Sequence, residues 1–123
     1  VLFYRLDKNV KAQDVVVIEK VTPDSDGKKA LFISRVIAVA GDTVEITEDG
    51  RVLVNGNNLI ESNIFSTTQP YEGYTEYPLT LGEGECFVLS DARRNSEDSR
   101  YFGPVARKEI QGTVITIVRR NNL

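Results

Sequence analysis

The chain consists of short apolar runs, many of them rich in β-branched residues, that are separated by turn-forming residues. The runs occupy residues 1–6, 14–20, 30–40, 43–47, 51–54, 86–89 and 112–118. They are too short for typical helices and suit strands, and Asp49-Gly50 is a strong hairpin signal between two of them. We therefore expect an all-β, or mainly β, fold of coiled antiparallel sheets with a barrel-like core. The run at 14–20 has consecutive apolar residues and is expected to be buried on both faces, and 104–110 could hold one short helix.

Composition limits the chemistry of the chain. With 123 residues and 41% hydrophobic content, the chain has the size of one domain with its own core. The net charge is −3 and the basic residues are scattered, which argues against nucleic-acid binding. There is no histidine, so Ser-His-Asp and Cys-His catalysis are excluded and a zinc site is not expected. The single cysteine, Cys86, is expected in the core and cannot form a disulfide within the chain. We expect no metal and no cofactor.

The chain has no methionine and begins at Val1, inside an apolar run. We therefore expect it to be a piece of a longer protein. It contains no stretch that is long and apolar enough to be a transmembrane or signal segment. A membrane anchor would have to precede Val1.

The longest polar segment, residues 90–103, lies directly between two apolar runs. It is about three times longer than an ordinary hairpin connection needs to be. Its Asp and Arg residues are placed to pair, and its Ser and Asn residues to bond main-chain groups, so we expect an ordered, functional loop. The alternative is a solvated turn with an Asp98–Arg100 pair on the surface, which would contribute little to stability.

This segment resembles the last signature box of type I signal peptidases, the membrane-anchored Ser/Lys peptidases that release secreted proteins. Residues 35–42 resemble a second box of the family, Lys-Arg-x-x-Gly-x-Pro-Gly-Asp, and residues 14–17 more weakly resemble a third. The positions of the last box that match in register are Asp91, Arg93, Asn95, Ser96, Asp98, Ser99, Arg100, Phe102, Gly103 and Val105. The resemblance implies one peptidase-like domain with a core of about 1–47 and 85–120 and an inserted β flap of about 48–84, since loops tolerate insertion.

The resemblance also implies a chemistry. In the family, a serine attacks the peptide carbonyl and a neutral lysine, its pKa lowered by burial, acts as the general base. The resemblance gives Ser96 the role of orienting that lysine, and gives Asp98 and Arg100, with Asp91, the role of supporting the loop that carries Ser96. Peptide contacts are implied for Ile33, Arg35 and Val36.

The sequence departs from the family pattern at three places. The box that carries the nucleophile is not in the chain, the position of the general-base lysine is Ser34, and the opening Gly-Asp-Asn of the last box reads Ser90-Asp91-Ala92. Lys29 is the nearest upstream lysine, but in an extended strand it lies roughly 16 Å from position 34 and on the opposite face. Arg35 cannot act as a base because a guanidinium stays protonated. We expect Ser34, Ser90 and Ser96 to form a polar pocket by hydrogen-bonding one another or a water.

Two functions follow from these observations. The parent protein is either a signal-peptidase-I-like enzyme of the secretion pathway that cuts after small residues, or a non-catalytic accessory factor that binds secreted or pilus proteins during surface assembly. For the chain as given we expect no peptidase activity. A third class, the self-cleaving Ser/Lys domain of repressors, is disfavoured by the long flap and by the 95–100 box. Secreted preproteins or pilins are the expected partners, and the expected location is the extracytoplasmic side of the cell membrane.

Overall fold

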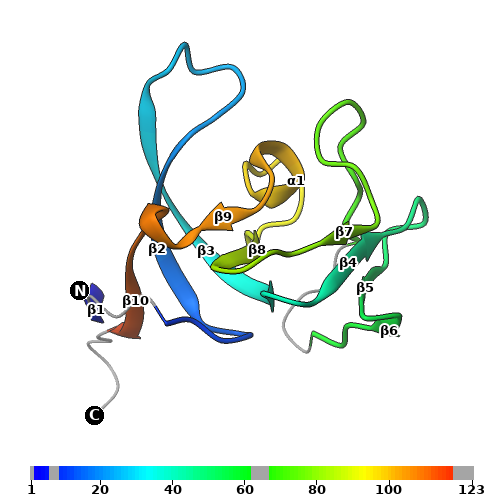
Figure 1. Cartoon of the computed structure of the whole chain (residues 1–123), viewed down its shortest axis with the longest axis horizontal. Helices are drawn as coiled ribbons and strands as arrows, with labels where there is room; N and C mark the ends of the chain where they lie inside the picture. The colour runs from blue at the N-terminus through cyan, green and yellow to red at the C-terminus, as the bar shows by residue number, and fades with distance from the viewer. Residues whose placement is uncertain (1, 6–8, 62–66, 118–123) are drawn as a thin grey trace.

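The computed structural model describes residues 2–5, 9–61 and 67–117. Ten strands form two antiparallel sheets in this part of the chain (Figure 1). The six-stranded sheet has the order β1 (Leu2–Arg5), β10 (Ile110–Ile117), β2 (Val15–Val21), β3 (Lys29–Val39), β8 (Glu85–Leu89) and β9 (Val105–Ala106). The four-stranded sheet has the order β6 (Asn57–Asn58), β5 (Val52–Val54), β4 (Thr43–Ile46) and β7 (Leu79–Thr80). The prediction of a mainly β fold with antiparallel sheets is confirmed.

The helical content is small. One α-helix, α1 (Ser99–Phe102), lies inside the long polar segment, and a 3-10 turn, η1 (Arg107–Glu109), lies in the region where a helical turn was expected. The Asp98 side chain caps α1 by accepting a hydrogen bond from the N–H of Arg100, and Gly103 ends the helix with a φ of 79°. Aspartate at the N-cap and glycine after the last turn are preferred positions, so a helix of four residues can form here.

Strand β8 is buried on both faces. Cys86, Phe87, Val88 and Leu89 are all buried. Phe87 and Leu89 belong to the core cluster that also holds residues of the four-stranded sheet, whereas Cys86 and Val88 belong to a second cluster with residues of β2. The polar segment that follows Leu89 therefore starts from a strand that is packed on both faces.

Strand β2 is not buried on both faces, as the sequence led us to expect. Val16 and Ile18 are fully buried, whereas Val15 and Val17 are only half-buried. The outer face of the strand is left partly open because no element of the described structure lies over it. The division into a core and an inserted flap stays a prediction. The second sheet begins at β4, a few residues before the expected boundary.

Candidate functional site

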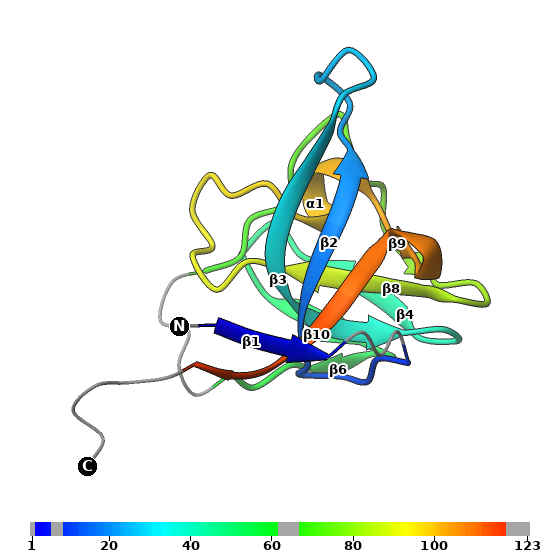
Figure 2. The same cartoon turned by 90° about the vertical axis from the view of Figure 1, so that its left-hand side faces the viewer.

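The two neighbours of strand β3 pair with different parts of it. Its pairing with β2 runs from Lys29 to Arg35, whereas its pairing with β8 covers only the stretch from Arg35 to Val39. β8 ends at Leu89, and the chain then turns away into the loop 90–98. In Figure 2 this loop, in yellow, leaves on the side of β3 that faces away from β2. Within the described residues, the β3 edge over residues 29–34 therefore has no partner strand.

The main-chain groups of two exposed apolar residues point to this open edge. Val36 faces β2, because its N–H donates to the carbonyl of Asp14 and its carbonyl accepts from the N–H of Gln13, both at 2.7 Å. Alternate residues of a strand face the same side, so the N–H and C=O of Ile33 and Leu31 face away from β2. Their side chains are 55% and 67% exposed. The open edge thus offers both hydrogen-bonding groups and apolar surface.

Arg35 joins this edge to the start of the loop 90–98. Its Nε and Nη2 donate to the two carboxylate oxygens of Asp91 at 3.0 and 2.9 Å, and its Nη1 donates to the carbonyl of Gln13 at 3.2 Å. The hydrogen bond from Arg35 lowers the pKa of the Asp91 carboxyl, and the same bond raises the pKa of Arg35. Arg35, which was expected to contact a peptide, and Asp91, which was expected to support the loop, therefore form one ion pair.

The Asp98–Arg100 pair is buried, which excludes the alternative of a solvated surface pair. Both side chains have no exposed area. The Arg100 Nε and Nη2 donate to the two oxygens of Asp98 at 2.9 and 2.8 Å, and the N–H of Ser90 donates to the same carboxylate at 3.1 Å. Ser90 and Asp98, the two ends of the loop 90–98, are therefore joined through the Asp98 carboxylate. The buried negative charge of Asp98 is paired with the Arg100 guanidinium.

Arg93 connects the loop to residues between β6 and β7, a role that the sequence did not reveal. Its buried guanidinium donates to the carbonyl of Ser90 at 2.7 Å, to the hydroxyl of Thr68 at 2.7 Å and to the carboxylate of Glu61. These partners lie up to 32 residues away in the sequence. The match of Arg93 to the signature box was the only signal that could have pointed to it.

Tyr71 covers the other buried arginine. The Arg100 guanidinium lies 4.4 Å from the centre of the Tyr71 ring, and the Tyr71 hydroxyl donates to the carbonyl of Ser96 at 2.7 Å. The Arg100 Nη1 also donates to the carbonyl of Gln69 at 3.1 Å. A segment of the region predicted to be a flap thus helps to fix the main chain at Ser96.

The three serines do not form the expected network with one another. The Ser90 hydroxyl accepts from the N–H of Ala92 at 3.2 Å, and the Ser96 hydroxyl donates to the carbonyl of Ala92. Ser34 is 4% exposed, and its hydroxyl has no hydrogen-bond partner among the described residues. The expectation of direct bonds between these hydroxyls is therefore wrong.

Two lysines, one in β2 and one in β3, pair with carboxylates and not with the candidate serines. The Lys20 Nζ lies 2.9 Å from the carboxylate of Glu109, and the Lys29 Nζ lies 3.9 Å from Glu19. The described residues contain no hydrogen bond between a lysine and Ser34, Ser90 or Ser96.

Of the three residues assigned to peptide binding, two lie on or beside the open edge. Ile33 faces it directly, and Arg35 lies where the pairing with β8 begins. Val36 is fully buried and pairs with Val88, so its side chain is not available to a peptide. Within the described residues, no helix is long and apolar enough to cross a membrane, and no group of three or more acidic or cysteine side chains is placed to hold a metal ion.

The sequence and the fold both match one family. The family described as signal peptidase, peptidase S26, matches residues 2–119. This chain belongs to the signal peptidase family. The family assignment made from the signature boxes is confirmed. The assignment of Ser34 to the position of the family's general-base lysine stays a prediction.

Several curated relatives and a solved structure show how far the similarity extends. The plasmid transfer protein TraF of Escherichia coli is 38% identical over 96 residues, which cover 76% of this chain and 51% of TraF. Signal peptidase I of Leptolyngbya laminosa is 40% identical over 84 residues, covering 68% of this chain and 39% of that protein. The chain thus spans about half or less of the length of these curated relatives. The crystal structure of a signal peptidase I from Enterococcus faecalis matches with a TM-score of 0.64 at 30% identity and covers 88% of this chain and 97% of that one.

Proposed function

We propose that this signal-peptidase-like domain binds an extended segment of an exported precursor protein and does not hydrolyse it. The peptide adds as a strand to the open edge of β3, where the main-chain groups of Leu31 and Ile33 supply hydrogen bonds. The exposed side chains of these two residues supply shallow apolar contacts. The names of the relatives, signal peptidase I and plasmid transfer protein TraF, support a secreted preprotein or a pilin-like subunit as the partner.

The observation that carries the proposal of binding without cleavage is the side chain at position 34. Hydrolysis by a Ser/Lys pair needs an amine that accepts the proton of the serine. Here the position holds Ser34, which is buried and has no hydrogen-bond partner among the described residues. Loss of one member of a nucleophile–base pair typically lowers the rate by ~10⁴–10⁶.

A second candidate is a working peptidase, in which the product of the complete gene supplies the nucleophile and another base. The intact supporting contacts favour this candidate. The Asp98–Arg100 pair still braces the loop 90–98, and the Arg35–Asp91 pair still holds its start against β3. In both candidates we place the domain on the extracytoplasmic side of the cell membrane, with an anchor outside this chain.

Binding to the open edge is tested with a fluorescent extended peptide that contains Ala-x-Ala, titrated with the 123-residue chain. Fluorescence anisotropy should show saturable binding, and Ile33→Asp should weaken it at least about tenfold, since a charge placed in an apolar contact with the peptide costs roughly 1.4 kcal/mol or more. Ile60→Asp is the matched control, because Ile60 is 91% exposed and lies outside this edge. Equal binding by both variants would refute the proposed binding edge.

Cleavage is tested separately by mass spectrometry of the same peptide with the product of the complete gene. The proposal expects an intact peptide. If only the base is missing, Ser34→Lys in that protein should raise cleavage, provided that circular dichroism shows an unchanged fold. Cleavage by the unaltered protein would establish the second candidate instead.

A further inference from the structure

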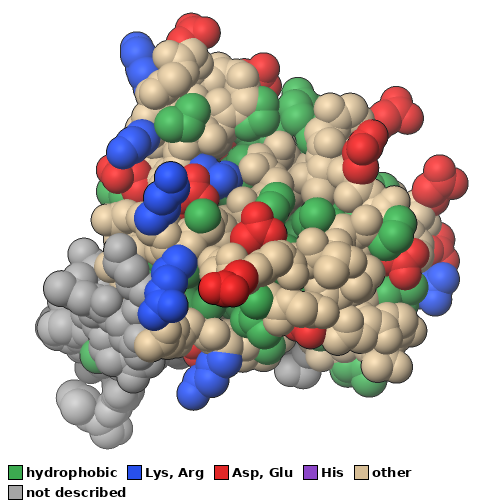
Figure 3. Space-filling model, in the orientation of Figure 1, with side chains coloured by type: hydrophobic (Ala, Val, Ile, Leu, Met, Phe, Trp, Pro, Cys, Tyr) green, Lys and Arg blue, Asp and Glu red, His purple; other side chains and the backbone are tan. Residues whose placement is uncertain are grey.

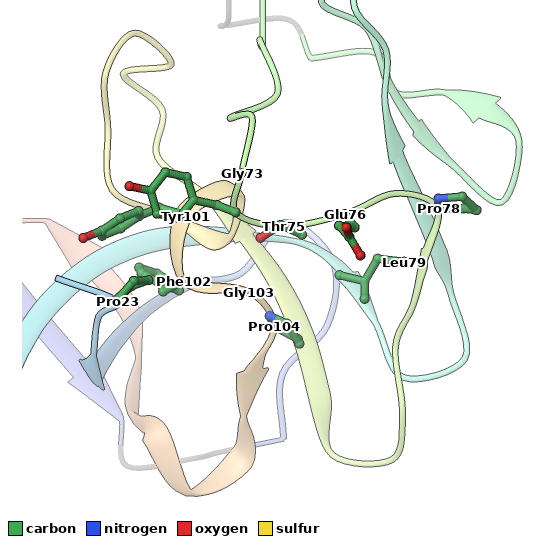
Figure 4. A pocket seen from close by; sticks show the side chains of 11 residues that line it. Pro23, Gly73, Thr75, Glu76, Pro78, Leu79, Tyr101, Phe102, Gly103 and Pro104 are labelled. Atoms are coloured by element: carbon green, nitrogen blue, oxygen red, sulfur yellow. The ribbon is translucent and has the colours of Figure 1, made fainter. Parts of the chain in front are cut away.

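A cavity of about 690 Å³, separate from the open edge of β3, is lined mainly by aromatic and proline side chains. Three segments contribute to it: the turn after β2, the loop before β7, and the end of α1 with the residues that follow it. We call it the aromatic groove, and its rings come from Pro23, Tyr74, Pro78, Tyr101, Phe102 and Pro104 (Figure 4). None of the residues of the β3 site lines it.

The walls of the aromatic groove are held together by the carboxylate of Asp24. It accepts hydrogen bonds from the hydroxyls of Tyr101 and Tyr74, at 2.7 and 3.4 Å. The two tyrosine rings meet edge to face with their centres 4.9 Å apart. Behind them, Phe102 packs against Phe32 with ring centres 5.2 Å apart. Three segments distant in the sequence are therefore fixed in place, which lowers the ordering cost of binding a ligand.

The lining favours a proline-rich ligand over an added strand. Strand addition requires an accessible row of main-chain groups, and β7, the one described strand that reaches the groove, has only two residues. Tyrosine, phenylalanine and proline rings instead present flat apolar surfaces. A polyproline II segment fits such surfaces because it needs no main-chain pairing and is already extended before it binds.

The charges at the aromatic groove favour a basic ligand. Glu76 lines it and is exposed, and Asp24 lies beside Pro23 at its rim, whereas none of the lining residues is a lysine or an arginine. Figure 3 shows hydrophobic side chains in the notch between the two projections at the top of the view, and acidic side chains on the projection to the right. An exposed carboxylate beside an apolar groove attracts a cation and repels an acidic segment.

We propose that the aromatic groove binds a proline-rich segment of a partner protein that carries a lysine or an arginine. The tyrosine pair stacks on the proline rings, and Glu76 pairs with the cationic side chain. This proposal goes beyond peptide binding at β3. It depends on a different surface, so either proposal can fail without the other.

The test is a titration of the 123-residue chain with a labelled peptide, Arg-Ala-Pro-Pro-Pro-Pro-Ala-Arg, followed by fluorescence anisotropy. Saturable binding is expected. Tyr74→Ala should weaken it about three- to tenfold, as loss of one ring contact does. Glu76→Gln should weaken binding of this peptide but not of the same peptide with both arginines replaced by glutamine. Ile60→Ala, which changes an exposed residue outside the groove, should leave the affinity unchanged.

Further titrations distinguish binding in the groove from nonspecific attraction of the two arginines to the acidic chain. A Gly-Ser peptide with the same two arginines should bind at least tenfold more weakly, and the Ala-x-Ala peptide should not displace the proline-rich one. Circular dichroism of Tyr74→Ala controls for loss of fold. Equal affinity for the Gly-Ser peptide, no saturable binding, or no effect of Tyr74→Ala would each overturn the proposal.

Discussion

The main-chain N–H of Val88 donates a 2.9 Å hydrogen bond to the buried hydroxyl of Ser99. This bond fixes the first residue of α1 to the C-terminal end of β8. Ser34 offers a contrast, because it is also a buried serine but its hydroxyl has no partner in the described structure. The two serines therefore differ in what their hydroxyls contribute to stability.

We predict opposite effects when each serine is replaced by alanine. Ser99→Ala leaves the N–H of Val88 buried without an acceptor and should lower the free energy of unfolding by about 1–3 kcal/mol. Ser34→Ala removes an unsatisfied polar atom and should leave stability unchanged or raise it by up to about 1 kcal/mol. Urea unfolding followed by circular dichroism measures both. A clear loss in Ser34→Ala would mean that its hydroxyl has a partner.

Removal of the Asp98 carboxylate should be among the most damaging single changes in the chain. Asp98→Ala leaves the buried guanidinium of Arg100 without its counter-charge and should cost about 3–5 kcal/mol. The double variant with Arg100→Met should recover part of that loss, since no buried charge remains unpaired. Urea unfolding of the single and double variants measures both losses in the free energy of unfolding. A loss below about 1 kcal/mol for the single variant would show that the pair is exposed in solution.

The Arg35–Asp91 pair should contribute stability that depends on pH. The pKa of the Asp91 carboxyl is lowered in the folded state, so its contribution is present above the ordinary pKa of aspartate and is lost as the pH falls through the lowered value. The Asp91 side chain is half-exposed, which limits the contribution to about 1 kcal/mol or less. Asp91→Asn should therefore be slightly less stable than the unaltered chain at neutral pH and equal to it in strong acid. Thermal unfolding across this pH range would show whether the two curves converge.

The thiol of Cys86 should react slowly while the chain is folded. Burial raises its pKa to about 12, so almost no thiolate exists near neutral pH. A pKa raised above the unfolded value of about 8.5 means that the stabilising contribution is complete below that pH and is lost as the pH rises toward about 12. Labelling by a disulfide reagent should be much faster in urea than in buffer. Equal rates would place the thiol at the surface.

The sequence predicted the strands well and the site only in part. β-branched runs and glycine turns depend on local preferences, so the main strands could be located from residue type alone. Helix α1 was missed because it has four residues and depends on one cap, Asp98. The extent of the open edge of β3 could not be predicted, because it depends on where the pairing with β8 stops, at Arg35. The bonds of Arg93 to Glu61 and Thr68 were missed because nothing local links those positions.

The place of β10 between β1 and β2 has a consequence for how the chain folds. The hairpin of β2 and β3 can form early, but the strand that completes its outer side is the last of the described chain. During synthesis β2 must therefore wait with one side unpaired, and such long-range pairing slows folding. A nonsense mutation that removes β10 would leave β1 without its partner strand and β2 paired on one side only, with β3, and such open strand edges promote aggregation.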